Sequence, residues 1–236
     1  MDKITKELIN ALSSGPVRQY LSDHEHDDIR QIILKHKEIL GIPSTRLVDQ
    51  IASRKKAKDK LPMYYENAAV IYPPVENLEQ SSSERTARFK AELLGTMIPK
   101  ELACGADLTG GFGVDSYFFS KSIRRLDYVE ADSSLLEIAK YNHRLLGVDN
   151  IDYHPATAEQ FLAATRGVFD FIYADPSRRQ SSGRKISSLE DSQPDIIRLA
   201  PQIFQKTPLL IVKASPLLDI QAGISKIPFV KRVIII

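Results

Sequence analysis

A glycine-rich turn directly after a short apolar stretch constrains this chain most. Residues 107–113 read Asp-Leu-Thr-Gly-Gly-Phe-Gly, they follow Leu102-Ala103-Cys104, and a helix is expected over 114–120. Glycine lets the backbone turn sharply and lets a ligand approach the main chain closely. The first N–H groups of a helix have no intrahelical partners and attract anions or carboxylates. The sequence therefore predicts a cofactor-binding turn at the end of a strand.

The turn alone does not identify the cofactor. A dinucleotide fingerprint needs G-x-G-x-x-G after a strand and an acid about 20 residues later. Gly111-x-Gly113-x-x-Ser116 has serine at the third position, and Glu130 supplies an acid 17 residues beyond Gly113. A strand, turn and helix without any ligand would show a similar pattern, so this alternative also stays open at this point.

Three acidic residues favour a methyl donor over a dinucleotide. Asp107 would repel a pyrophosphate, whereas it would attract a cofactor with a cationic amino group. Glu130 ends the run 126–130, where a carboxylate can accept hydrogen bonds from both hydroxyls of a ribose. Asp175 ends a further apolar run, 169–174, and Pro176 follows it in an acid–proline turn.

The chain resembles a known family at these positions. Residues 107–113 resemble motif I of the class I S-adenosylmethionine-dependent methyltransferases, and Glu130-x-Asp132 with Ala139 and Asn142 resembles the second motif. Residues 175–178, Asp-Pro-Ser-Arg, resemble the fourth. More narrowly, the helix 83–90 and the run 213–219 are similar to bacterial methyltransferase-like proteins with a THUMP-like C-terminal domain. The class-level resemblance covers about residues 80–236.

The resemblance implies S-adenosylmethionine as cofactor and a set of site residues. The residues that it implies for cofactor binding are Asp107, Thr109, Gly110, Gly111, Gly113, Glu130, Ala131, Thr157 and Ala158. Those that it implies for catalysis are Asp175, Pro176 and Ser177. Basic residues that follow the acid–proline turn are expected to bind the substrate, namely Arg178, Arg179, Arg184 and Lys185. Thr157 replaces the usual acid of the third motif, and Ser177 replaces the second proline of the fourth.

Alternating patterns predict an α/β fold, with a Rossmann-like class I methyltransferase sheet and helices on both of its faces. Strands are expected near 102–108, 125–130, 150–154, 168–174, 208–213 and 229–236, and helices near 113–121, 133–146, 157–164 and 193–204. Ser133 is expected to cap the second of these helices. Asp107, Glu130, Thr157 and Asp175 then lie at carboxyl ends of strands, where such sheets bind ligands.

A small all-helical domain is expected over residues 1–62, with a linker or irregular strand pair over 63–80 and the methyltransferase domain over 81–236. The N-terminal helices are predicted at 4–12, 17–22, 27–40, closed by Gly41, and 42–53. A capping box from Ser81 to Glu84 opens a further helix that reaches Met97. A class I sheet needs another strand after 229–236, so we expect a C-terminally truncated chain or one that continues.

Composition restricts the cellular setting. The chain has 236 residues, a net charge of +2 and one cysteine, Cys104, which excludes a disulfide framework. No apolar run reaches transmembrane length, so we expect a cytoplasmic protein that does not contact a membrane. His24 and His26 do not share a helix face, so no metal site is expected.

The sequence favours N-methylation of a base in RNA, with tRNA or rRNA as partner. Net charge gives no nucleic-acid signature, but basic runs lie at 53–60 and 178–185. The alternatives are a non-catalytic donor-binding or RNA-binding scaffold and a methyltransferase that acts on protein or a small molecule. A nicotinamide-dependent oxidoreductase is disfavoured by Asp107 and by Asp175-Pro176. The oligomeric state is not readable.

Overall fold

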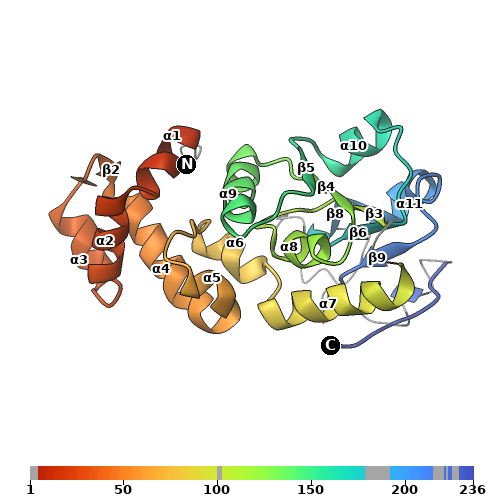
Figure 1. Cartoon of the computed structure of the whole chain (residues 1–236), viewed down its shortest axis with the longest axis horizontal. Helices are drawn as coiled ribbons and strands as arrows, with labels where there is room; N and C mark the ends of the chain where they lie inside the picture. The colour runs from red at the N-terminus through yellow and green to blue at the C-terminus, as the bar shows by residue number, and fades with distance from the viewer. Residues whose placement is uncertain (1–4, 100–102, 179–191, 215–220, 222, 225–228) are drawn as a thin grey trace. The chain divides into compact units, whose positions relative to one another are not determined.

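The computed structural model describes residues 5–99, 103–178, 192–214, 221, 223–224 and 229–236 (Figure 1). The chain forms two compact units that alternate along the sequence. The first unit consists of Met1–Leu94, Gly111–Lys121 and Asp132–Asp149, and the second consists of Gly95–Gly110, Ser122–Ala131 and Asn150–Ile236. Three separate stretches of the chain therefore build each unit.

The second unit contains a five-stranded sheet with the order β5-β4-β3-β6-β9. Its strands are β3 (Cys104–Asp107), β4 (Arg125–Val129), β5 (Ile151–His154), β6 (Phe171–Ala174) and β9 (Leu210–Val212), and every neighbouring pair is parallel. The order reverses at β3, which lies between β4 and β6. This confirms the predicted α/β fold with a Rossmann-like parallel sheet flanked by helices. In such sheets the reversal point is where ligands bind.

Helices α10 (Ala158–Ala164) and α11 (Ile196–Phe204) cover the sheet within the second unit (Figure 1). They share one apolar core cluster with the strands, made of Ala106, Leu108, Val129, Ala158, Phe161, Leu162, Phe169, Ile172, Leu199 and Ile203. All four residues of β6 are buried, which explains why its sequence is a continuous apolar run without alternation.

The first unit is mainly helical. Its helices are α1 (Lys6–Leu12), α2 (Gly15–Asp23), α3 (Ile29–Lys35), α4 (Ser44–Lys60), α5 (Pro62–Glu66), α6 (Val75–Gln80), most of α7 (Glu84–Met97), α8 (Val114–Ser120) and α9 (Ser133–Leu145). In the part of the chain that the structure describes, none of the helices is long and apolar enough to span a membrane.

The helix predicted over 27–40 is shorter than expected. It ends at Lys35, and a hairpin of β1 (Glu38–Ile39) and β2 (Ile42–Pro43) follows. Leu40 has φ 53° and Gly41 has φ 77°. Two central residues with positive φ are what a two-residue hairpin turn needs, so Gly41 turns a hairpin and does not close a helix.

Residues 63–80 are more ordered than an irregular linker. They include most of α5 and all of α6, and Tyr64, Tyr72 and Leu78 are fully buried. The Gln50 side chain donates to Tyr72 O (2.7 Å) and accepts from Tyr72 N (2.9 Å). Asn142 pairs with Ile71 in the same way, at 2.7 and 3.0 Å. Two amide side chains thus take the place of a strand partner. The domain boundaries at 62 and 80 stay a prediction.

Two predicted helix caps lie one or two residues from the true ones. Ser83, not Ser81, caps α7, because its Oγ accepts from Thr86 N (3.2 Å), while Glu84 accepts from Met63 N (2.9 Å). Asp132, not Ser133, caps α9, and its Oδ1 accepts from Ser134 N at 2.7 Å. In both cases several adjacent residues have capping side chains, so composition alone did not identify the right one.

The strand predicted over 229–236 is absent. This segment has no regular secondary structure, and Ile235 and Ile236 are 83% and 68% exposed. Apolar content suggested a strand, but a strand also needs a hydrogen-bonded neighbour. Within the described residues β9 is the last strand on its side of the sheet. The other five predicted strands and the four predicted helices are present. Their observed ends lie within about three residues of the predicted ones.

Candidate active site

Four predicted polar side chains lie at one edge of the sheet. Asp107 is the last residue of β3, Glu130 follows β4, and Asp175 follows β6. Thr157 lies three residues beyond the end of β5. These strands are parallel, so their carboxyl ends share an edge of the sheet. All four residues belong to the second unit. The edge is therefore the candidate site.

Asp107 organises the start of the glycine loop. Its side chain is almost completely buried, and Oδ1 accepts from the Thr109 backbone N (3.0 Å) and from Thr109 Oγ1 (3.3 Å). A carboxylate that bonds the backbone two residues on forms an Asx turn, which fixes the direction in which the loop leaves the strand. The Gly110 N–H then donates to Val129 O at 2.9 Å, which holds the loop against β4.

Glycine is required at three positions of this loop. A Cβ on Gly110 would lie 2.3 Å from the ring of Tyr128, so no larger residue fits there. Gly111 and Gly113, in the stretch that belongs to the first unit, have φ 57° and 82°, in the left-handed region where other residues are strained. The glycine pattern that predicted a ligand loop therefore also has a structural cause at each position, which is steric at Gly110 and conformational at Gly111 and Gly113.

Thr109 links the glycine loop to the acid–proline turn. Its hydroxyl donates to Asp107 Oδ1 and accepts from the Asp175 backbone N at 2.7 Å. The structure thus places Asp107, Thr109 and Asp175 in one hydrogen-bonded chain. Contact between Thr109 and a donor stays a prediction.

Glu130 and Ala131 continue from β4 at the same edge. The Glu130 N–H donates to His154 O at 3.1 Å, which extends the pairing with β5 by one residue. The side chain of Glu130 is partly buried, and Ala131 is exposed. A ligand can therefore reach both residues, as the predicted ribose contact requires.

Thr157 caps helix α10. Its Oγ1 accepts from Gln160 N (3.2 Å), and Gln160 Oε1 accepts from Thr157 N (2.9 Å), a complete capping box. This role alone explains threonine at the position. The hydroxyl oxygen keeps a second lone pair, which can accept a hydrogen bond from an adenine amino group. Ala158 is the buried first residue of the helix.

Asp175 forms an ion pair with Lys213, which the sequence analysis did not assign to the site. Lys213 Nζ lies 2.6 Å from Asp175 Oδ2, and both side chains are partly exposed. Lys213 directly follows β9 as Asp175 follows β6. A lysine at the end of an apolar strand was the signal that could have revealed it.

Pro176 and Ser177 connect β6 to a separate two-stranded sheet. Ser177–Arg178 forms β7, which pairs with β8 (Ser192–Gln193) in antiparallel register. Ser177 is exposed. The side chain of Arg178 and the predicted substrate residues Arg179, Arg184 and Lys185 lie outside the described residues.

The basic run 53–60 lies on α4, and several of its cations already have partners. Arg54 lies 3.5 Å from Glu25, Lys56 pairs with Glu79, and Lys55 donates to Asp27 O (3.2 Å). These contacts compete with any phosphate, so the run is a weaker candidate for RNA binding than the sequence suggested.

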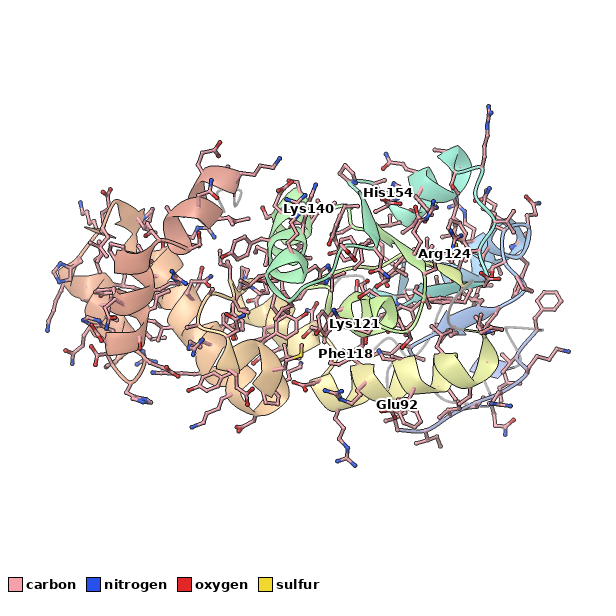
Figure 2. The ribbon with its side chains drawn as sticks, in the orientation of Figure 1. Glu92, Phe118, Lys121, Arg124, Lys140 and His154 are labelled. Carbon is pink, nitrogen blue, oxygen red and sulfur yellow. The ribbon has the colours of Figure 1, made fainter. Side chains whose placement is uncertain are left out.

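A second charged cluster joins β4 to β5. His154, labelled in Figure 2, lies 2.6 Å from Asp127, and Arg125 approaches the other oxygen of Asp127 at 2.9 Å. Burial opposes ionisation of Asp127, but the hydrogen bonds from His154 and Arg125 prevail and lower its pKa. The ion pair between Asp127 and His154 connects the neighbouring strands β4 and β5. Among the described residues, no group of three or more His, Cys, Asp or Glu side chains could hold a metal ion.

In the first unit, His143 of α9 supports the end of the glycine loop. It is 0% exposed, and its Nε2 lies 2.8 Å from Gly113 O, so Nε2 carries the hydrogen. Burial lowers the pKa of His143 to about 4. Sequence reasoning missed this residue, although it lies four residues after Ala139 on the apolar face of the helix.

No protein-family model matches this chain, and no curated protein matches it. Among solved structures, it is similar to a protein from Porphyromonas gingivalis W83 whose name gives methyltransferase as a provisional assignment, with 23% identity and a TM-score of 0.74. The match covers 94% of this chain and 52% of that one, so the chain spans about half the length of that protein. At this identity the likeness shows the fold alone.

Weaker matches are an rRNA methylase from Streptococcus thermophilus and a SAM-dependent methyltransferase from Agrobacterium tumefaciens. The first has 13% identity and a TM-score of 0.45, over 61% of this chain and 80% of that one. The second has 18% identity and a TM-score of 0.42, over 56% of this chain and 45% of that one. Likenesses of this size carry no argument about this chain.

Proposed function

We propose that this chain is the donor-binding and catalytic part of an S-adenosylmethionine-dependent methyltransferase. The observation that carries the proposal is the shared edge where β3, β4 and β6 present Asp107, Glu130 and Asp175 beside the reversal in strand order. A dinucleotide fits less well, because the carboxylate of Asp107 begins the loop that would have to hold a pyrophosphate.

Each part of the edge has a role in donor binding. The Glu130 carboxylate accepts from both ribose hydroxyls, and the glycine loop lets the donor approach the backbone. The negative charge of Asp107 favours the cationic amino end of the donor. Thr157 and the Ala158 amide face the adenine. Among these contacts the one to ribose is the easiest to test directly, because Glu130 follows β4, outside the glycine loop, and its side chain is only partly buried.

Replacement of Glu130 by alanine should weaken donor binding. Two ribose hydroxyls lose their acceptor, which costs on the order of 1–3 kcal/mol, or roughly 5- to 150-fold in affinity. Calorimetric titration with S-adenosylmethionine and with its demethylated product measures this. Asp152→Ala is the matched control, because Asp152 is an exposed carboxylate of β5 that lies before the strand end. Equal affinity of Glu130→Ala and the wild type would exclude the ribose contact, and tighter binding of NADH would overturn the cofactor assignment.

The transfer itself needs alignment more than acid–base help, because the sulfonium donor is already activated. A nitrogen lone pair of the acceptor forms the new N–C bond while the C–S bond breaks and its electron pair stays on sulfur. Positive charge passes to the nitrogen, which then loses a proton to solvent water. Asp175 and the Pro176 carbonyl accept hydrogen bonds from the acceptor amino group, direct its lone pair to the methyl group and offset the developing charge.

For the acceptor we propose an amino group of a base in RNA, either tRNA or rRNA. The support is the basic sequence 178–185, which begins three residues after Asp175. Arg178 and Ser192, which flank residues 179–191 in the sequence, are paired in the β7–β8 register, and Arg178 lies two residues after Pro176. Cations at that place would hold phosphates near the transferred methyl group.

Charge reversal at Arg184 and Lys185 should weaken RNA binding without a change in donor affinity. Loss of cations that contact phosphate also reduces the dependence of affinity on salt. Binding of total tRNA and of rRNA fragments at several salt concentrations tests this. Reversal of the exposed Lys35 and Lys37 in the helical region is a control with the same change in net charge. RNA binding that is absent or independent of salt would favour a protein or small-molecule acceptor.

One observation favours a second candidate, a donor-binding or RNA-binding scaffold without catalysis. Thr157 stands where the family has an acid, and its backbone N–H and hydroxyl both serve the cap of α10. Labelled donor separates the two candidates. Donor binding with transfer of label to RNA supports the enzyme, whereas donor binding without transfer supports the scaffold.

A further inference from the structure

Lys213 lies beside the acidic residue that the proposed mechanism uses. β6 and β9 are neighbours with Ala174 opposite Val212, so Asp175 and Lys213 form the next pair in register beyond the two strands. The Lys213 N–H donates to Ala174 O at 2.9 Å, which fixes the backbone of this pair. The ammonium group then meets Asp175 Oδ2 at 2.6 Å.

Asp175 is thus bound by two residues that follow different strands, Thr109 after β3 and Lys213 after β9. From the β3 side, the Thr109 hydroxyl accepts from the Asp175 N–H at 2.7 Å and positions its backbone. From the β9 side, Lys213 Nζ binds the side chain. With its backbone fixed on one side and a carboxylate oxygen bound on the other, the Asp175 side chain has little rotamer freedom left.

We propose that Lys213 is a positioning residue for methyl transfer, which acts through Asp175 and restricts the acceptor to a neutral amino group. This proposal rests on the methyltransferase function proposed above. An adjacent ammonium group favours the ionised form of a carboxyl group. Only the ionised form is purely a hydrogen-bond acceptor, as binding of an amino group requires.

The charge of the pair also bears on the acceptor. Asp175 and Lys213 together carry no net charge, so they attract a fully protonated amine, such as a lysine side chain, much less than an unpaired carboxylate would, and offset less of its desolvation. A carboxylate paired with an ammonium is also a weak base, unsuited to removing the proton of an alcohol before transfer. The amino group of a nucleobase is neutral and needs only hydrogen-bond acceptors, so it fits this pair best.

Replacement of Lys213 by methionine tests the proposal. The variant removes the charge but keeps much of the side-chain volume. We expect unchanged affinity for S-adenosylmethionine, a fall in kcat of roughly 10- to 100-fold, and an acidic limb of the pH–rate profile that moves up by about one pH unit. Lys213→Arg should restore most of the rate and the original acidic limb, because arginine keeps the cation. A purely structural role would lower the rate equally at all pH values.

Lys206→Met is the matched control. Lys206 is also partly buried and donates to Thr165 O at 2.7 Å, but it lies before β9 and pairs through its backbone with Phe169, which precedes β6. Its loss should leave rate and pH profile unchanged. If the wild type is active and Lys213→Met has the same kcat and pH–rate profile, the positioning role is overturned, whereas the proposed methyltransferase function stands.

A second measurement does not depend on turnover. Titration of carbon-13-labelled aspartate carboxyl groups by NMR, with Asp175→Asn for assignment, should show that Asp175 protonates at higher pH in Lys213→Met than in the wild type. An identical titration would overturn the positioning role whatever the activity. If the pH of Asp175 protonation rises in Lys213→Met but the wild type transfers no methyl group, the proposed function fails. The ion pair is then still shown to set the protonation of Asp175.

Discussion

Replacement of Asp175 by alanine should reduce methyl transfer by about 100-fold or more, with donor affinity unchanged. Loss of one preorganised group that stabilises transition-state charge has an effect of this size in other enzymes. Here the alanine variant removes the acceptor for the substrate amino group and also leaves Lys213 without its carboxylate partner at 2.6 Å. Single-turnover transfer of labelled methyl groups to RNA, with calorimetry of donor binding, measures both quantities.

Asp175→Asn separates the two losses. Asparagine keeps a carbonyl oxygen that can accept from the acceptor amino group, but it has no charge to pair with Lys213. We expect a rate between those of the wild type and the alanine variant. Because the backbone N–H of residue 175 still reaches Thr109 in both variants, unfolding midpoints should stay close to that of the wild type. A wild-type rate in Asp175→Ala would show that the acid–proline turn is only structural.

The sheet and the place of the site could be predicted because their signals are local and repeat along the chain. β6 and β9 are continuous apolar runs, β3, β4 and β5 mix apolar with polar residues, and Asp107, Glu130 and Asp175 stand at or directly after the ends of three of the five strands. Parallel pairing then brings these ends to one edge without further information. The pattern did not require knowledge of any contact between distant residues.

What the sequence did not reveal depends on partners far away in the chain. Asn142 and Gln50 take the place of a strand partner for Ile71 and Tyr72, and the residues are 71 and 22 positions apart. The segment 229–236 has the composition of a strand but no neighbour in the described sheet. Lys213 reaches Asp175 across 38 positions. Only the packed structure brings such pairs together.

The site prediction was also incomplete because one side chain type can serve two purposes. Thr157 and Thr109 were expected to contact the donor, and both have structural partners, in a helix cap and in the link from Asp107 to Asp175. Threonine at such positions is compatible with either role. The contacts with the donor therefore stay predictions until a complex or a titration tests them.

Mild acid should destabilise the first unit through His143. Above about pH 6.5, the usual pKa of histidine, the imidazole is neutral in the folded and the unfolded state and contributes no pH dependence. Below that pH the unfolded chain takes up a proton, while the folded His143 does not until its pKa of about 4. Burial is the main cause of this shift, and nearby Lys121 adds to it, whereas the hydrogen bond to Gly113 opposes it.

The free energy of unfolding should therefore fall as the pH drops from about 6.5 to about 4, by about 3 kcal/mol in total from this group alone. His143→Gln provides the comparison, because glutamine can still donate to Gly113 O but does not titrate. The chain contains no tryptophan, so urea unfolding is best followed by circular dichroism, at pH 7, 6 and 5. The other four histidines are present in both proteins, so their effects cancel in the difference. We expect the wild type to lose stability with acid more steeply than the variant. Parallel curves would mean that His143 is protonated in the folded state, and that the end of the glycine loop does not depend on a neutral imidazole.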